Sequence, residues 1–350
     1  MEAFSNIREV KRLWHSHKNI FLDLNFIKCF YNNHQNIRHI FLTDKDINIY
    51  CHIFKLRLTN TVNYLNNYLI FKPLFSALNI NVLYLTNSFI TNVPSFSAKK
   101  KITISKLINT IEKRNNFFLI VIPDFLFQNL KGNLKKEFTK VEIESEMILT
   151  IRPNWIEIDD YLNDLKRKYR NKFFLITKKS SLLQIRKLEY NDVANYKDKV
   201  ADLFNNIIDN SKFSGPKFNT ETLFSLMKSN YINLYGYFLN ENLIAFSSEI
   251  FNNNILYSYY VGFDKDLNKK YSLYGRILIE TIKNGIHNKV EKIIFGRTAN
   301  EYKSNFGATS SQSFVFLKSN NKYTEKIFQV LFKLLKVKPW KTRSPFKKGN

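Results

Sequence analysis

Apolar and polar positions recur along the chain with two different periods, and the changes of period predict its helices and strands. Residues 39–58 contain two β-rich apolar runs joined by the turn residues Asp44 to Asp46, which predicts a hairpin. Apolar residues in 103–114 return at helical spacing with charges on the opposite face, and a strand is expected directly afterwards at 117–122. A further strand of alternating character is predicted at 140–151.

The second half of the chain repeats this sequence of elements more clearly. A helix with capping aspartates is predicted from Asp159 to Phe173, followed by helices at 190–204 and 220–227. Three strands of an antiparallel meander follow, then a helix that Gly285 is placed to end, a strand at 291–296, a short helix at 300–306 and a strand at 311–317. A strand, a crossover helix and the next strand usually form a right-handed parallel unit. The sequence therefore predicts a mixed sheet whose architecture occurs twice.

The length of 350 residues agrees with two domains. We expect an N-terminal domain at 1–151, a second domain at 152–318 and a C-terminal helix with a basic tail at 319–350. The boundary is expected between Arg152 and Asp160, where a charge-capped helix follows a completed strand.

The formal net charge of +25 leaves two interpretations open. Such a field attracts nucleic acid, an acidic membrane surface or a phosphorylated ligand. Equally, 42 of the 54 basic residues are Lys in a chain rich in Asn, Ile, Phe and Tyr, a composition typical of AT-rich genomes. The basic run Lys166, Arg167, Lys168 and Arg170 has the same two interpretations, as a phosphate-facing patch or as solvated residues that suit the helix dipole.

Other features of the sequence indicate the compartment of the protein and whether it has a membrane segment or a metal site. Cys29 and Cys51 cannot form a disulfide framework, which favours a reducing, cytoplasmic compartment. The N-terminus has charges where a signal peptide needs apolar residues, and no apolar run reaches the ~20 residues of a spanning helix. His15 and His17 lack partners of a metal-ligating type, so no metal is expected. The run 323–350 predicts a helix packed on the body with a solvated basic tail, or an interfacial helix on a membrane.

Three stretches resemble the GNAT acyltransferase superfamily, and within it the two-domain branch of Fem-type peptidoglycan-bridge aminoacyltransferases and related cell-envelope acetyltransferases. They are YLNDLKRKYRNKF at 161–173, LYSYYVGFDKDLNKKYSLYGRILIETIKNG at 256–285 and FGRTANEYKSNFGA at 295–308. The resemblance implies tandem GNAT-like domains, each a mixed, mostly antiparallel sheet flanked by helices. It covers about 143–317 well and is only architectural before that.

The chain departs from the family pattern where coenzyme A is expected. Ordinary GNAT enzymes hold the pyrophosphate on an Arg/Gln-x-x-Gly-x-Gly/Ala turn at a helix N-terminus. Here NKKYSLYG keeps only Gly275, and Tyr271 and Leu273 would crowd a phosphate. The aminoacyl-tRNA users of the Fem branch also lack that turn. Acyl-CoA and aminoacyl-tRNA both remain open as the acyl donor.

The candidate site is the segment 295–308. Gly296 would let the chain turn at the carboxyl end of a parallel strand, where ligands of α/β sheets bind, and Arg297 would emerge at the cleft. Tyr302 could donate a proton, and an exposed Lys303 could hold the ligand. The structural alternative is a helix start in which Thr298 or Asn300 caps, Lys303 faces water and Tyr302 packs.

Three further residues complete the expected site. Glu249 is a candidate general base, or else a carboxylate on the solvated face of its strand. Tyr259 and Lys270 lie within the second resembling stretch and are expected to bind substrate.

Two functions follow. The first is an N-acyltransferase that moves an acetyl or aminoacyl group to an amino group of a cell-envelope sugar, peptide or similar precursor. Its partners would be a small-molecule or peptide acceptor, tRNA if the donor is aminoacyl-tRNA, and an anionic membrane as a peripheral contact. The alternative is a non-catalytic GNAT-like module that binds RNA or anionic surfaces, whose affinity would fall steeply with salt.

Overall fold

The computed structural model describes residues 1–14, 19–57, 79–132, 134–208, 215–321 and 323–347, so His15 and His17 lie outside the described residues. The chain divides into two compact units. Unit 1 comprises Met1–Glu144, Lys212–Asn219 and Gln312–Lys338, and unit 2 comprises Ser145–Ser211, Thr220–Ser311 and Pro339–Asn350.

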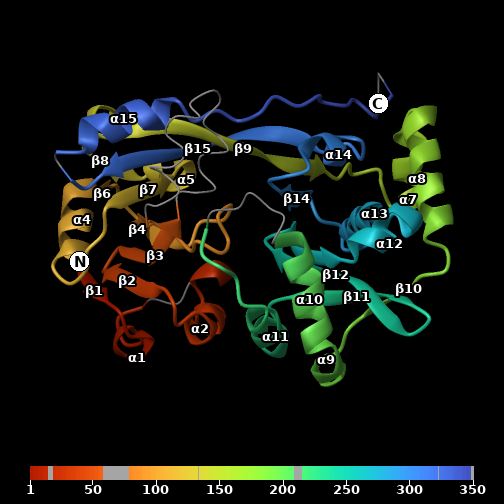
Figure 1. The fold of residues 1–350 in the computed structure, drawn as a ribbon, viewed down its shortest axis with the longest axis horizontal. Coiled ribbons are helices and arrows are strands. Elements are labelled where there is room, and N and C mark those ends of the chain that lie inside the picture. Colours follow the sequence, from red (N-terminus) through yellow and green to blue (C-terminus); the bar gives the residue numbers. More distant parts are fainter. Residues whose placement is uncertain (15–18, 58–78, 133, 209–214, 322, 348–350) are drawn as a thin grey trace. The chain divides into compact units, whose positions relative to one another are not determined.

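Unit 1 is built on a mixed sheet with the strand order β1-β2-β3-β4-β7-β15 (Figure 1). Among the described strands of this sheet β4 and β7 are the parallel pair, and α4 lies between them in the chain. The predicted hairpin is confirmed by β2 and β3, and the predicted helix by α4, whose apolar residues Ile104, Leu107, Ile108 and Ile111 are buried. The elements are β1 (Glu2–Phe4), α1 (Ile7–Val10), α2 (Leu24–Asn33), β2 (Arg38–Asp44), β3 (Ile47–Arg57), β4 (Asn79–Tyr84), β5 (Phe96–Ala98), β6 (Ile102–Thr103), α4 (Ile104–Glu112), β7 (Leu119–Pro123), α5 (Asp124–Phe127), β8 (Leu130–Lys131), α6 (Leu134–Glu137), β15 (Thr309–Ser319) and α15 (Glu325–Lys333).

Unit 2 repeats the arrangement with the strand order β10-β11-β12-β13-β14-β9. Here β13 and β14 are the parallel pair, and every other neighbouring pair is antiparallel. The predicted mixed sheet with one parallel crossover is therefore confirmed in each unit. The elements are β9 (Thr139–Thr150), α7 (Ile158–Asp164), α8 (Arg167–Lys179), β10 (Gln184–Lys187), α9 (Tyr190–Val193), α10 (Lys197–Ile208), α11 (Glu221–Lys228), β11 (Asn233–Leu239), β12 (Asn242–Asn252), β13 (Ile255–Phe263), α12 (Lys265–Tyr271), α13 (Leu273–His287), β14 (Lys292–Gly296) and α14 (Asn300–Ser304).

The last sheet strand of each half of the sequence completes the sheet of the other half. β9 begins in unit 1, and its residues Met147–Thr150 pair with β14 in unit 2. β15 begins in unit 2, and its residues Val315–Ser319 pair with β7 in unit 1. Each unit is thus closed by a strand that the other half of the chain supplies.

Helices cover both faces of the unit 2 sheet. α10 approaches β13 so closely that a Cβ atom on Gly262 would lie 2.8 Å from the backbone of Leu203. On the opposite face, Leu273 and Ile277 of α13 pack with Val261 and Tyr237. The helix expected to end at Gly285 continues to His287, because Gly285 is buried and its missing side chain makes room for Ile293.

Candidate functional site

Strands β13 and β14 stop pairing while β13 still continues. Their parallel register covers only Ile255 to Tyr257 of β13, although β13 extends to Phe263. On its other side β14 changes register with β9 between Ile294 and Gly296. Tyr259 lies on the part of β13 that extends beyond its pairing with β14, and burial raises the pKa of its phenol. Binding at the carboxyl ends of sheet strands is the usual location of a ligand in α/β folds.

The turn that follows β14 has an unusual backbone. Gly296 has a φ of 73°, as predicted for a sharp turn, and a Cβ atom there would meet nothing within 4 Å. Thr298 and Ala299 also have positive φ values of 75° and 50°. A β-branched residue in this region is a true outlier, and such strain is concentrated at functional sites. The half-buried Arg297 lies in the middle of this turn.

Lys303 holds the turn in place through its ammonium group. Its Nζ donates hydrogen bonds to the carbonyl oxygens of Phe295, Gly296 and Arg297 at 2.7, 3.1 and 3.1 Å. These three bonds match the three N–H donors of an ammonium group. Lys303 is only 3% exposed, so the expectation of an exposed lysine is wrong. The side chain is buried because the strained turn presents converging carbonyl oxygens that need a donor.

Tyr302 lies in an aromatic cluster beside the turn. Its ring centroid is 5.5 Å from that of Tyr274 and 5.7 Å from that of Phe306. Lys172 of α8 places its Nζ 4.6 Å from the ring centre. Burial raises the pKa of the Tyr302 hydroxyl, so it keeps its proton at neutral pH. Burial, and then the charges of Arg343 and Lys168, lower the pKa of Lys172.

The N-terminus of α13 does not fit a coenzyme A pyrophosphate. The Asn268 side chain already accepts a hydrogen bond from the N–H of Tyr274, at 3.0 Å. A Cβ atom on Gly275 would lie 2.6 Å from the Tyr302 hydroxyl, so the space beside this glycine is filled by the protein. Leu273 is completely buried. The backbone groups that would cradle a phosphate are therefore capped or covered.

Glu249 is buried on β12, which excludes the solvated-face interpretation. It is 1% exposed, and Asn284 of α13 donates hydrogen bonds to both of its oxygens, at 3.2 and 3.0 Å. Burial raises the pKa of its carboxyl group to about 8. Among the described residues it makes no hydrogen bond with Arg297, Tyr302 or Lys303.

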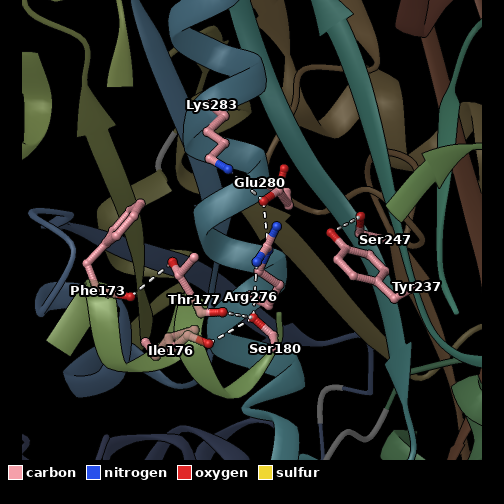
Figure 2. A network of polar contacts seen from close by, with 9 residues as sticks. All are labelled: Phe173, Ile176, Thr177, Ser180, Tyr237, Ser247, Arg276, Glu280 and Lys283. Atoms are coloured by element: carbon pink, nitrogen blue, oxygen red, sulfur yellow. Dashed lines mark hydrogen bonds and ion pairs between the residues drawn. The ribbon is translucent and has the colours of Figure 1, made fainter. Parts of the chain in front are cut away.

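A cavity of about 310 Å³ lies on the same side of the sheet as α13. Figure 2 shows the polar ladder along this helix, in which Arg276 bonds to Ser180 and Glu280, and Glu280 also bonds to Lys283. The cavity is lined by Leu183, Ile185, Arg186, Lys187, Tyr235, Arg276, Glu280 and Asn284. Its lining includes none of the residues of the strained turn.

The C-terminal segment 339–347 is attached to unit 2, which contradicts the expected solvated tail. Pro345 accepts a hydrogen bond from the N–H of Lys166 at 2.8 Å, and Phe346 packs on Trp155 and Tyr161. Arg343 forms an ion pair with Glu301 of α14, and its N–H bonds to Ser304 at 3.1 Å. The tail therefore holds the short helix that carries Tyr302 and Lys303.

The structure brings together Gly296, Arg297, Tyr302 and Lys303, whereas Tyr259 on β13 has its ring centroid 4.3 Å from that of Tyr260. Lys270 is exposed on α12, with its Nζ 5.1 Å from the ring centre of Tyr271, and Glu249 contacts α13 instead. Sequence reasoning missed Lys172 and Arg343. Lys172 follows a predicted basic run, but only its position over Tyr302 distinguishes it from its neighbours.

Comparison with known proteins agrees with this geometry. Residues 211–304 match the family model described as an acetyltransferase (GNAT) domain. This stretch, which includes the strained turn, is therefore similar to a GNAT acetyltransferase domain. No curated protein matches its sequence significantly.

Three solved structures share the fold over nearly the whole chain. FemX has 11% identity and a TM-score of 0.53, covering 94% of this chain and 100% of its own. L-PGS from Bacillus licheniformis has 8% identity and a TM-score of 0.52, covering 89% and 96%. The C-terminal DUF2156 domain of a proposed lysylphosphatidylglycerol synthetase from Agrobacterium fabrum has 8% identity and a TM-score of 0.51, covering 93% and 94%. At these identities the similarity establishes a Fem-like GNAT fold.

No helix among the described residues has the length and apolar character needed to cross a membrane. Likewise, no group of three or more His, Cys, Asp or Glu residues in the described part of the chain could hold a metal ion.

Proposed function

We propose that the protein is an N-acyltransferase that acylates an amino group of a cell-envelope sugar, peptide or similar precursor. The observation that carries the proposal is the strained turn Gly296–Ala299 at the end of β14. It lies inside the matched GNAT domain, at the point where β13 and β14 cease to pair. Open space beside Gly296 gives a ligand access to this turn.

The proposed roles follow from the contacts. Arg297 binds an anionic part of the donor or stabilises negative charge on the carbonyl oxygen during attack by the amine. As the amine nitrogen bonds to the acyl carbon and the acyl–donor bond breaks, Tyr302 gives its proton to the leaving oxygen or sulfur, and the proton lost by the nitrogen returns to the phenolate. The raised pKa of the phenol keeps that proton available. Lys303 positions the turn through its three carbonyl contacts. Tyr259 contributes to the wall of the site. Glu249 and Lys270 take no step in this proposal, because their contacts lie elsewhere.

Aminoacyl-tRNA is the donor that we favour over acyl-CoA. The capped N-terminus of α13 and the occupied space at Gly275 oppose a pyrophosphate at the usual GNAT position. An aminoacyl-tRNA would not need that turn, and the net charge of +25 would favour its approach. The partners implied are then tRNA and an amine-bearing acceptor associated with the cell envelope.

The test is a transfer assay that follows a labelled acyl group from acyl-CoA or from aminoacyl-tRNA to amine acceptors. Tyr302→Phe and Arg297→Met are expected to lower kcat with either productive donor, whereas Lys270→Met, an exposed lysine outside the turn, should keep full activity. If the wild-type protein transfers the acyl group from acyl-CoA as fast as from aminoacyl-tRNA, the assignment of aminoacyl-tRNA as the donor is refuted. Full activity of both turn variants would refute the site.

A further inference from the structure

The outer face of α8 exposes apolar side chains that the fold does not need. Phe174 is 51% exposed and Leu175 53%, and Leu182, three residues beyond the end of α8, is 72% exposed. The inner face of the same helix is already anchored, because Phe173 and Ile176 are buried in the core of unit 2. Figure 1 shows α8 beside α7 at the outer edge of unit 2. Removing the exposed groups would therefore cost little folding energy.

The same surface is strongly positive. Residues 165–188 contain nine Lys and Arg residues and no Asp or Glu. Arg167, Lys168, Lys178 and Lys179 are exposed, and none of them forms an ion pair with a described residue. Cations elsewhere in unit 2, such as Arg152 and Arg276, are paired with carboxylates. The charge of α8 is thus uncompensated by its own surroundings.

We propose that the outer face of α8 docks on an anionic lipid bilayer. A helix with basic residues beside Phe and Leu side chains suits the membrane interface, where apolar groups enter the acyl boundary and cations contact lipid headgroups. Leu175 and Leu182 gain from hydrocarbon but cannot stack on nucleic acid bases. Phe174 alone does not form a platform of aromatic rings for a single strand. Lipid therefore fits this surface better than RNA.

This surface is distinct from the acyl-transfer turn, although both use α8. Lys172, one helical turn before Leu175 at the edge of this surface, lies over the Tyr302 ring. The docking proposal does not depend on the reaction. A docked α8 would nevertheless bring Tyr302 near a membrane on which an envelope precursor is carried.

The experiment is flotation of the full chain with vesicles of phosphatidylcholine alone or with 30% phosphatidylglycerol, the composition being chosen to supply negative charge. Binding is expected only with phosphatidylglycerol. F174S/L175S should weaken partition about tenfold or more, because each side chain loses burial in the interface. K178Q and K179Q should each weaken it about fivefold, from ~1 kcal/mol per lysine near an anionic surface.

The matched control is I327S/V330S on α15, whose two apolar residues are 60% and 61% exposed and also lie among lysines. This variant should bind as the wild type does. The proposal is overturned if the control loses binding while F174S/L175S keeps it, or if neither variant changes partition. It is also overturned if the protein ignores both vesicles and binds tRNA through α8. Circular dichroism of each variant checks that it is folded, and the transfer assay is scored separately.

Discussion

Replacing Glu249 by Gln should make the protein more stable, and increasingly so as the pH rises. The carboxyl group is 1% exposed, and burial raises its pKa from the ordinary 4.5 to about 8. Gln keeps the size of the side chain and removes the ionisation. Rotation of the Asn284 amide would let the new amide donate to its oxygen, so the hydrogen bond is preserved.

The sign follows from proton binding. Between pH 4.5 and about pH 8 the unfolded chain has released this proton while the folded protein still holds it. The folded state then binds more protons than the unfolded state, so the free energy of unfolding falls as the pH rises through this window. At 1.36 kcal/mol per pKa unit, the penalty at pH 7 is roughly 3 kcal/mol. Between pH 5 and pH 8 it grows by roughly 3 to 4 kcal/mol.

The assay is urea unfolding of wild type and Glu249→Gln at pH 5, 6, 7 and 8. The gap between their free energies of unfolding should be below about 1 kcal/mol at pH 5 and widen steadily to pH 8. Glu142→Gln removes the same charge from an exposed position and serves as the control, for which no widening is expected. A gap that stays constant with pH would show that Glu249 is ionised in the folded protein, and the reasoning from burial would be refuted.

Three further predictions use other contacts. Burial lowers the pKa of His39 to about 4, so its contribution to stability should be lost as the pH falls from 6.5 towards 4, by roughly 2 kcal/mol at pH 5; His39→Gln should lessen this loss in acid unfolding curves. Gly275→Ala should cost about 1–3 kcal/mol through contact with the Tyr302 hydroxyl and less in a Tyr302→Phe background, and a double-mutant cycle showing simple additivity would contradict that contact. Phe346→Ala should lower both the kcat of the proposed transfer and the melting temperature, because the tail would no longer hold α14. The control Lys347→Ala should change neither the melting temperature nor KM. An unchanged kcat in Phe346→Ala would show that the tail does not position the site.

Most helices and strands could be predicted because their apolar periodicity is set by neighbouring residues in the sequence. The hairpin of β2 and β3 and the helix α4 show an apolar periodicity that does not depend on which segment packs against them. The single helix expected from Asp159 to Phe173 is instead two, α7 and α8, broken at Leu165. Leu165 forms a β-bridge with Phe346, and Lys166 bonds to Pro345. Contacts with residues so distant in the sequence cannot be predicted from the apolar periodicity around Leu165.

The candidate site was predictable in position but not in detail. The glycine after an apolar strand indicated the turn, and the structure gives Gly296 the positive φ that such a turn requires. The burial of Lys303 could not be predicted, since it depends on three carbonyl oxygens that converge only because Thr298 and Ala299 adopt left-handed conformations. The same holds for Glu249, whose strand pattern gave no sign that α13 covers it.

The exchange of closing strands makes the two halves of the gene product obligate folding partners. A fragment ending at residue 151 would lack β15, so β7 would keep only β4 as a partner, and the complementary fragment would lack β9, so β14 would keep only β13. The two strands that lose a partner, LIVIP and KIIFG, are largely buried and apolar. Each fragment alone would therefore expose an aggregation-prone sheet edge. Produced together, the two fragments should find each other by donating the missing strands. Cutting this chain after residue 151 would thus yield two fragments that complement each other rather than two independent domains.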